Sequence, residues 1–177
     1  MYDSRSSFWR YIMKKSQKIV NCALFAAIYV ALCAVFQSIS FGPIQFRFAE
    51  ILCLFSIDYF WAFIGVTIGC FLSNTFFGGL GIADMIFGTL ATVIGCLLAY
   101  LFRNVRYKGN PFLSASMIVI ANAIIIGIEL GYILSTPDLI PLYMLQVGIG
   151  ELVVLAIGLP LYKRIKIYFD TKLSDQN

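Results

Sequence analysis

Long apolar runs separated by short polar segments dominate this 177-residue chain. A helix needs about 20 apolar residues to cross a bilayer, because each residue adds about 1.5 Å of length. Five runs are long enough: 19–39, 59–77, 81–102, 114–134 and 141–162. A sixth run, 46–57, is too short for a full crossing. The pattern predicts an all-α integral membrane protein that folds as one helical bundle.

Composition excludes most other classes of protein. The chain is 60% hydrophobic and only 12% charged, which is far from a soluble domain of this size. It has no histidine, and its five cysteines all lie inside apolar runs without CxxC spacing. We interpret the cysteines as small buried side chains and expect no metal site and no cofactor in this chain. The first run exceeds the core of a cleavable signal peptide, so it is expected to remain as the first span.

Lysines and arginines gather at the ends of the apolar runs. Twelve of the 13 form three patches, made of Arg5, Arg10, Lys14, Lys15 and Lys18; Arg103, Arg106 and Lys108; and Lys163, Arg164, Lys166 and Lys172. Cytoplasmic loops of membrane proteins collect such residues. The patches therefore predict that both termini and the 103–108 loop are cytoplasmic. The chain has a net charge of +4. Because its cations lie at the ends of the spans, we expect them to face anionic lipid headgroups and not nucleic acid.

The patches also predict the number of crossings. Run 19–39 leaves the cytoplasm and run 81–102 returns to it, so residues 46–77 must cross twice. As α-helix these 32 residues reach about 48 Å, against about 60 Å for two full spans. We therefore predict a short second helix whose start, with segment 40–45, is pressed into the outer side of the bundle. The resulting prediction is a six-helix membrane domain at 19–165, with cytoplasmic segments 1–18 and 166–177.

Seven strongly polar residues lie within or beside these spans, where polar groups are usually functional. They are Arg47, Glu50, Asn74, Asp84, Asn122, Glu129 and Glu151. Asn122 and Glu129 are two helical turns apart and so share a face. Each residue has a structural alternative: Arg47 can pair with Glu50, Asp84 can cap its own helix, and Asn74 can bond to a neighbouring helix. Because five of the seven fall in the outer half of the bundle, we favour a shared polar pocket.

The charge balance of this pocket indicates the kind of ligand. Four carboxylates face one guanidinium, so the empty pocket carries about three negative charges if all of them ionise, which is costly to bury. A cation with several N–H donors relieves that cost, and a carboxylate can accept two parallel N–H bonds from a guanine-like base. A stripe of small residues, Asp84, Gly88, Ala91 and Gly95, allows a helix or a flat ligand to approach. The aromatic residues expected around a planar ring are Phe41, Phe46, Phe48 and Tyr132.

Segments in the same order along the chain resemble the QueT family of membrane proteins. They are 42–50 (GPIQFRFAE), 69–74 (GCFLSN), 84–92 (DMIFGTLAT), 126–130 (IGIEL), and 148–152 (GIGEL) with 158–162 (GLPLY). The resemblance covers about residues 19–165. It implies a substrate-binding S component of an energy-coupling factor (ECF) transporter in a prokaryotic plasma membrane. Its implied substrate is a queuosine precursor, a 7-deazaguanine base such as 7-aminomethyl-7-deazaguanine or queuine, captured in a pocket near the outer face that the loops after helices one and three close.

The resemblance also implies partners. These are a transmembrane T component and two cytoplasmic ATPases, with an AxxxA motif on the first helix docking the T component. Ala23, Ala27 and Ala31 have that spacing, although on the residues alone such a stripe is more often ordinary helix packing. The chain has no Walker A sequence, so we expect no enzymatic activity in it and assign ATP hydrolysis to a partner.

Two other functions remain open. The first is a stand-alone, ion-coupled secondary transporter of a small polar aromatic solute, with the membrane carboxylates as ion relays. The absence of internal repeats counts against it, since many such transporters are built from repeats. The second is an intramembrane enzyme with paired carboxylates, which the lack of histidine and of a nucleophile motif disfavours.

Overall fold

Helices account for nearly all of the structure in the computed structural model. The structure describes the backbone of residues 4–40 and 45–174 and the side chains of residues 15–40 and 45–171. The helical elements in chain order are α1 (Ser4–Val35), α2 (Gln37–Ser40), η1 (Phe48–Ile57), α3 (Phe60–Phe77), η2 (Asp84–Gly88), α4 (Thr89–Leu101), α5 (Phe112–Ile133), η3 (Pro137–Leu139) and α6 (Ile140–Ser174). Within the described residues no β-strand forms, so the predicted all-α class is confirmed.

Five segments of the described chain are long and apolar enough to span a membrane. They correspond to the five long runs of the sequence, with α1 and α6 extending well beyond them. Neither long helix is interrupted where the predicted cytoplasmic segments meet the membrane domain, because α1 continues through residue 18 and α6 through residue 166.

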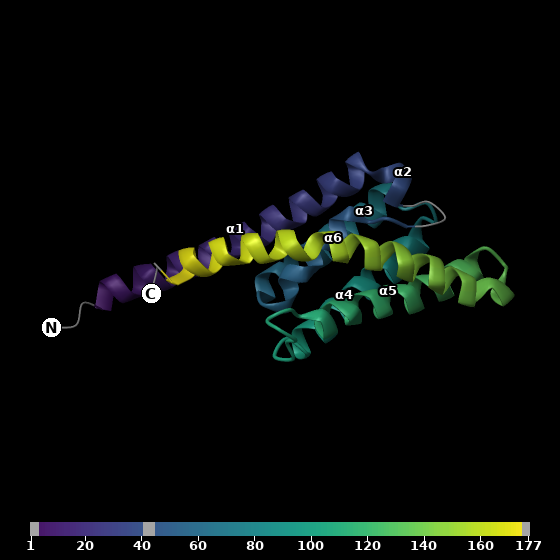
Figure 1. Cartoon of the computed structure of the whole chain (residues 1–177). Coiled ribbons are helices and arrows are strands. Elements are labelled where there is room, and N and C mark those ends of the chain that lie inside the picture. Colours follow the sequence, from purple (N-terminus) through teal and green to yellow (C-terminus); the bar gives the residue numbers. More distant parts are fainter. Residues whose placement is uncertain (1–3, 41–44, 175–177) are drawn as a thin grey trace.

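Both ends of the chain and the turn between α4 and α5 lie at one end of the bundle (Figure 1). We call this the terminal end. Two of the basic patches meet there on one carboxylate, because Arg106 Nη2 lies 2.5 Å from Asp58 Oδ1 and Lys166 Nζ lies 3.3 Å from Asp58 Oδ2. The Tyr162 hydroxyl also donates to Asp58. The folded chain therefore gathers its basic patches on one side, as the charge pattern requires of segments that share one face of a membrane.

Ten residues of the short run 46–57, Phe48–Ile57, form a 3₁₀ helix, η1, in place of an α-helix. A 3₁₀ helix rises about 2.0 Å per residue against about 1.5 Å for an α-helix, so its ten residues cover about 20 Å instead of about 15 Å. Stretching the backbone in this way compensates for part of the length deficit that the sequence predicts for residues 46–77. Such long 3₁₀ runs are uncommon, and seven of the ten residues are buried inside the bundle.

The segment before η1 lies inside the bundle at both of its described ends. Ser40 and Gln45 are buried, and the Gln45 carbonyl packs so closely on α6 that a Cβ at Gly150 would overlap it. The prediction that this segment is pressed inward is confirmed for these two residues. Residues 41–44 lie outside the described part of the chain.

Helices α1 and α3 pack through glycine. A Cβ at Gly65 would lie 2.6 Å from the Cys22 carbonyl oxygen, and one at Gly69 would lie 2.7 Å from the Tyr29 Cβ. Small residues at such contacts let two helix backbones approach closely, which is a main source of association in lipid. The face of α1 that carries Phe25, Ala26 and Tyr29 is thereby turned into the bundle.

Candidate functional site

All seven polar residues singled out in the sequence are buried, and none exposes more than 3% of its surface. They come from five elements: η1 supplies Glu50 with Arg47 directly before it, α3 supplies Asn74, η2 supplies Asp84, α5 supplies Asn122 and Glu129, and α6 supplies Glu151. Buried charges persist only when neighbouring groups compensate them, so the surroundings of each one carry information about function.

Glu50 is held by hydrogen-bond donors from three elements. Its Oε1 accepts from the Tyr29 hydroxyl of α1 at 2.5 Å and from the Thr92 hydroxyl of α4 at 3.4 Å. Its Oε2 accepts from the Cys53 thiol at 2.9 Å, one turn along η1. These bonds join α1, η1 and α4 around a single carboxylate and fix the position of the start of η1.

Arg47, directly before η1, lies beside Asn74 at a glycine of η2. A Cβ at Gly88 would overlap the Asn74 side-chain amide and would lie 3.5 Å from Arg47 Nη1. The Asn74 amide also donates to the Cys70 thiol at 3.3 Å. A glycine at position 88 therefore lets Asn74 of α3 and the Arg47 guanidinium approach η2 closely. This contact explains why one residue of the predicted small-residue stripe is glycine.

Asp84 begins a π-helix, an element that is rare and is frequently found at functional sites. Its Oδ2 accepts a 2.8 Å hydrogen bond from the Leu80 backbone N–H, which lies in the loop before the helix. Asp84 therefore fastens the loop between α3 and η2 to the start of the helix.

Glu129 contrasts with Glu50, because no N–H, hydroxyl or thiol of the described residues donates to its carboxylate, and its side-chain partner is the carboxyl group of Asp84. Arg47 and Asp84 lie near enough to act on it electrostatically. Asn122, on the same face of α5, donates to the Ile118 carbonyl of its own helix at 3.1 Å. Glu129 is therefore a buried acceptor that the rest of the described structure leaves open.

Glu151 forms a second acidic group with Glu50. Both Glu50 and Arg47 act on it electrostatically, and its Oε1 has no hydrogen-bond donor in the described part of the chain. Arg47 therefore acts electrostatically on one carboxylate in each of two groups, Asp84 with Glu129 and Glu50 with Glu151. That the four carboxylates and the guanidinium form one substrate pocket stays a prediction.

The aromatic surroundings differ in part from the expectation. Phe46 and Phe48 are half-buried, and the Phe48 ring lies 4.9 Å from that of Phe36. Tyr132 is 69% exposed, so its predicted place in the pocket was wrong. It lies in the last turn of α5, where residues 132–135 are all exposed. Phe41 lies outside the described residues.

Sequence reasoning missed four residues that bond to the predicted ones or to each other: Tyr29, Cys53, Cys70 and Thr92. The sequence interpretation treats the cysteines only as small hydrophobic side chains. All five are free thiols. Cys33, Cys53, Cys70 and Cys96 are buried, which confirms that interpretation for these four, whereas Cys22 is partly exposed. Cys53 and Cys70 also take part in the polar network. Tyr29 offered a signal, because a hydroxyl in the middle of an apolar span needs a partner.

The alanine stripe of α1 lies on the outside of the bundle. Ala23, Ala27 and Ala31 are exposed, whereas the opposite face of α1 packs against α3. Together with Ile68 and Leu72 of α3, they line an apolar groove of about 700 Å³. Such a smooth groove can accept a partner helix at close range.

Comparison with known proteins agrees with this architecture. A family model described as QueT transporter matches residues 19–166. The chain is 36% identical over 162 aligned residues to the queuosine precursor transporter QueT of Lactococcus lactis subsp. cremoris, strain MG1363, covering 82% of this chain and 91% of that protein. No solved structure matches the chain. With its apolar helices and this match over most of its length, the chain is a multi-pass membrane protein that belongs to the QueT transporter family.

Proposed function

We propose that this chain is the substrate-binding subunit of an ECF-type importer, and that it captures a 7-deazaguanine precursor of queuosine at the outer face of the plasma membrane. The observation that carries the proposal is the buried cluster of four carboxylates around Arg47, in which Glu129 and Glu151 keep open acceptor oxygens. A 7-deazaguanine base presents several N–H donors on one edge, which is the complement that such oxygens need. The name of the Lactococcus relative points to the same class of solute.

In this proposal the chain crosses the membrane six times. The second crossing is the short helix η1, and the terminal end lies in the cytoplasm. The gathering of the basic patches at the terminal end supports that orientation. The seven buried polar residues then lie between the helices as the substrate site, and the loops after α1 and α3 cover it from outside. The loop after α3 is already tied to the site through Asp84.

The same proposal assigns energy coupling to other subunits. The exposed alanine groove of α1 supports docking of a transmembrane T component, because it offers a smooth apolar surface to a helix. Two cytoplasmic ATPases would supply the hydrolysis. The chain itself would act only in binding and carrying the solute, without a cofactor of its own.

The proposed role as a binding subunit is tested by measuring ligand binding and solute uptake in separate assays. Purified chain in detergent is expected to bind a 7-deazaguanine base tightly, measured by isothermal titration, yet vesicles that contain the chain alone should accumulate none, with or without an ion gradient. Adding the T component and both ATPases with ATP should start uptake. Accumulation by the chain alone under a proton or sodium gradient would instead establish a secondary transporter.

The charge of the cluster leads to a prediction about ligand choice. We expect the aminomethyl base, which is a cation, to bind at least about tenfold more tightly than the neutral nitrile precursor, because a charged hydrogen bond contributes about 1.5–3 kcal/mol. Titrating both bases into the same preparation measures the ratio. Equal affinities would contradict the charge argument while leaving the family assignment intact.

A further inference from the structure

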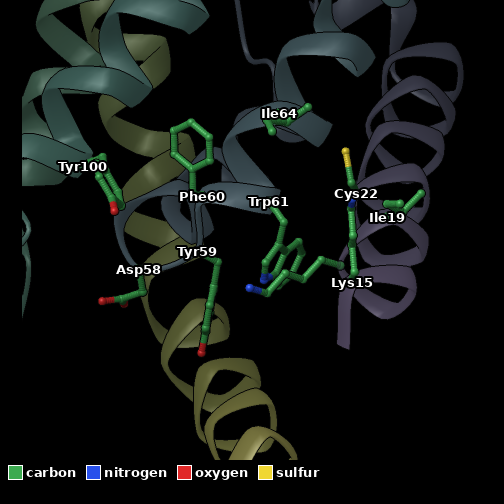
Figure 2. Close-up of a pocket in the computed structure, with 10 residues that line it drawn as sticks. Lys15, Ile19, Cys22, Asp58, Tyr59, Phe60, Trp61, Ile64 and Tyr100 are labelled. Atoms are coloured by element: carbon green, nitrogen blue, oxygen red, sulfur yellow. The ribbon is translucent and has the colours of Figure 1, made fainter. Parts of the chain in front are cut away.

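A cavity separate from the buried carboxylates opens at the terminal end of the bundle. It has a volume of about 600 Å³ and lies between α1, the junction of η1 with α3, and the last turn of α4. Figure 2 shows the side chains that surround it, with Lys15 reaching from α1 toward Trp61 of α3. None of the seven polar residues of the candidate substrate site lines it.

The lining of this cavity changes character along α1. Lys15 and Lys18 are charged, and one turn further along the helix Ile19 and Cys22 present an apolar wall. On the α3 side, Tyr59 and Trp61 come before Ile64 in the same direction. Tyrosine and tryptophan are typical of the boundary between lipid chains and water. The cavity therefore has one polar and one apolar half, and both lie along a membrane-spanning helix.

The charge of the polar half is positive. Lys15 and Lys18 are exposed and have no acidic partner among the described residues. The carboxylate in the lining, Asp58, is already paired with Arg106 and Lys166, and in Figure 2 it points away from Lys15. A further cation contacts a lining residue, because the Arg103 guanidinium stacks 4.1 Å from the centre of the Tyr100 ring.

We propose that this cavity binds the headgroup and upper acyl chain of an anionic phospholipid. Lys15 and Lys18 contact the phosphodiester, and the acyl chain runs along Ile19, Cys22 and Ile64. Charge complementarity selects this occupant, since lysines at a membrane surface attract anionic headgroups while the adjoining wall is apolar. The proposal goes beyond the transported solute and does not depend on its identity.

Trp61 supplies a reporter for this site. The chain has two tryptophans, Trp9 and Trp61, so a Trp9→Phe variant leaves only the one that lines the cavity. This variant is placed in phosphatidylcholine nanodiscs that contain a small fraction of brominated phosphatidylglycerol or, in parallel, brominated phosphatidylcholine. We expect phosphatidylglycerol to quench Trp61 fluorescence by half at about one tenth of the fraction that phosphatidylcholine needs, from the combined effect of two lysines.

Two double variants on the Trp9→Phe background complete the test. Replacing Lys15 and Lys18 with glutamine should bring the two lipids within about twofold of each other. Replacing Lys163 and Arg164 with glutamine removes the same charge from exposed positions of α6 at the same end and should leave the preference intact. Equal quenching by both lipids in the parent, or a preference that both double variants reduce alike, would overturn the proposal, because the latter would be a general effect of surface charge.

Discussion

Leucine in place of Ala27 is expected to abolish uptake while leaving solute binding within about twofold of the parent, a change under 0.5 kcal/mol. Ala27 is exposed at the centre of the apolar groove on α1, and the opposite face of that helix packs on α3. A larger side chain there separates a docked helix from α1, and close packing is what holds helices together in lipid. It does not reach the buried carboxylates.

Three measurements check this expectation: solute uptake in cells that express the coupling subunits, co-purification of the T component, and solute affinity of the isolated chain. Ala156→Leu is the matched control, because it adds the same group to an exposed position of α6 that does not line the groove. It should retain uptake. Loss of solute binding in Ala27→Leu with the complex intact would mean that the stripe faces the substrate site.

Replacing Glu129 with glutamine is expected to weaken solute binding by about 1–3 kcal/mol, or about 5- to 150-fold. The change keeps the shape of the side chain but converts one acceptor oxygen into a donor, so a ligand N–H loses its partner. The structure sharpens this expectation, because no N–H, hydroxyl or thiol of the described residues donates to either oxygen of Glu129. The same change at Glu151 should cost less, since that carboxylate is grouped with Glu50, whose bonds already engage α1 and α4.

The unfolding temperature of the Glu129→Gln variant shows whether Glu129 acts in ligand binding or in holding the fold together. Because no N–H, hydroxyl or thiol of the described chain donates to Glu129, and glutamine removes its repulsion with Asp84, the ligand-free Glu129→Gln protein should unfold at the same temperature as the parent or above it. Asp138→Asn offers a control, as it removes a negative charge from an exposed position just beyond α5. It should leave affinity unchanged. Unchanged binding in Glu129→Gln, with a normal unfolding temperature, would remove this residue from the site.

The local composition of the chain determines the membrane-spanning helices and identifies the charged residues inside them. A run of about 20 apolar residues can satisfy its backbone in lipid only as a helix, so the positions of the five long spans follow from the sequence. The same physics makes an intramembrane charge conspicuous, because it must find a buried partner or a cavity. For that reason Arg47, Glu50 and Glu129 can be identified from the sequence alone, and all three are buried.

Only the tertiary structure decided the conformation of η1 and which face of each helix points toward lipid or into the bundle. Lipid tails and a protein interior are equally apolar, so an apolar helix surface does not reveal whether it faces lipid or a neighbouring helix. The prediction for Tyr132 was wrong for this reason. The stretched form of η1 and the π-helix at Asp84 arise because several helices must meet around Glu50 and Gly88, and only the packed bundle imposes that geometry.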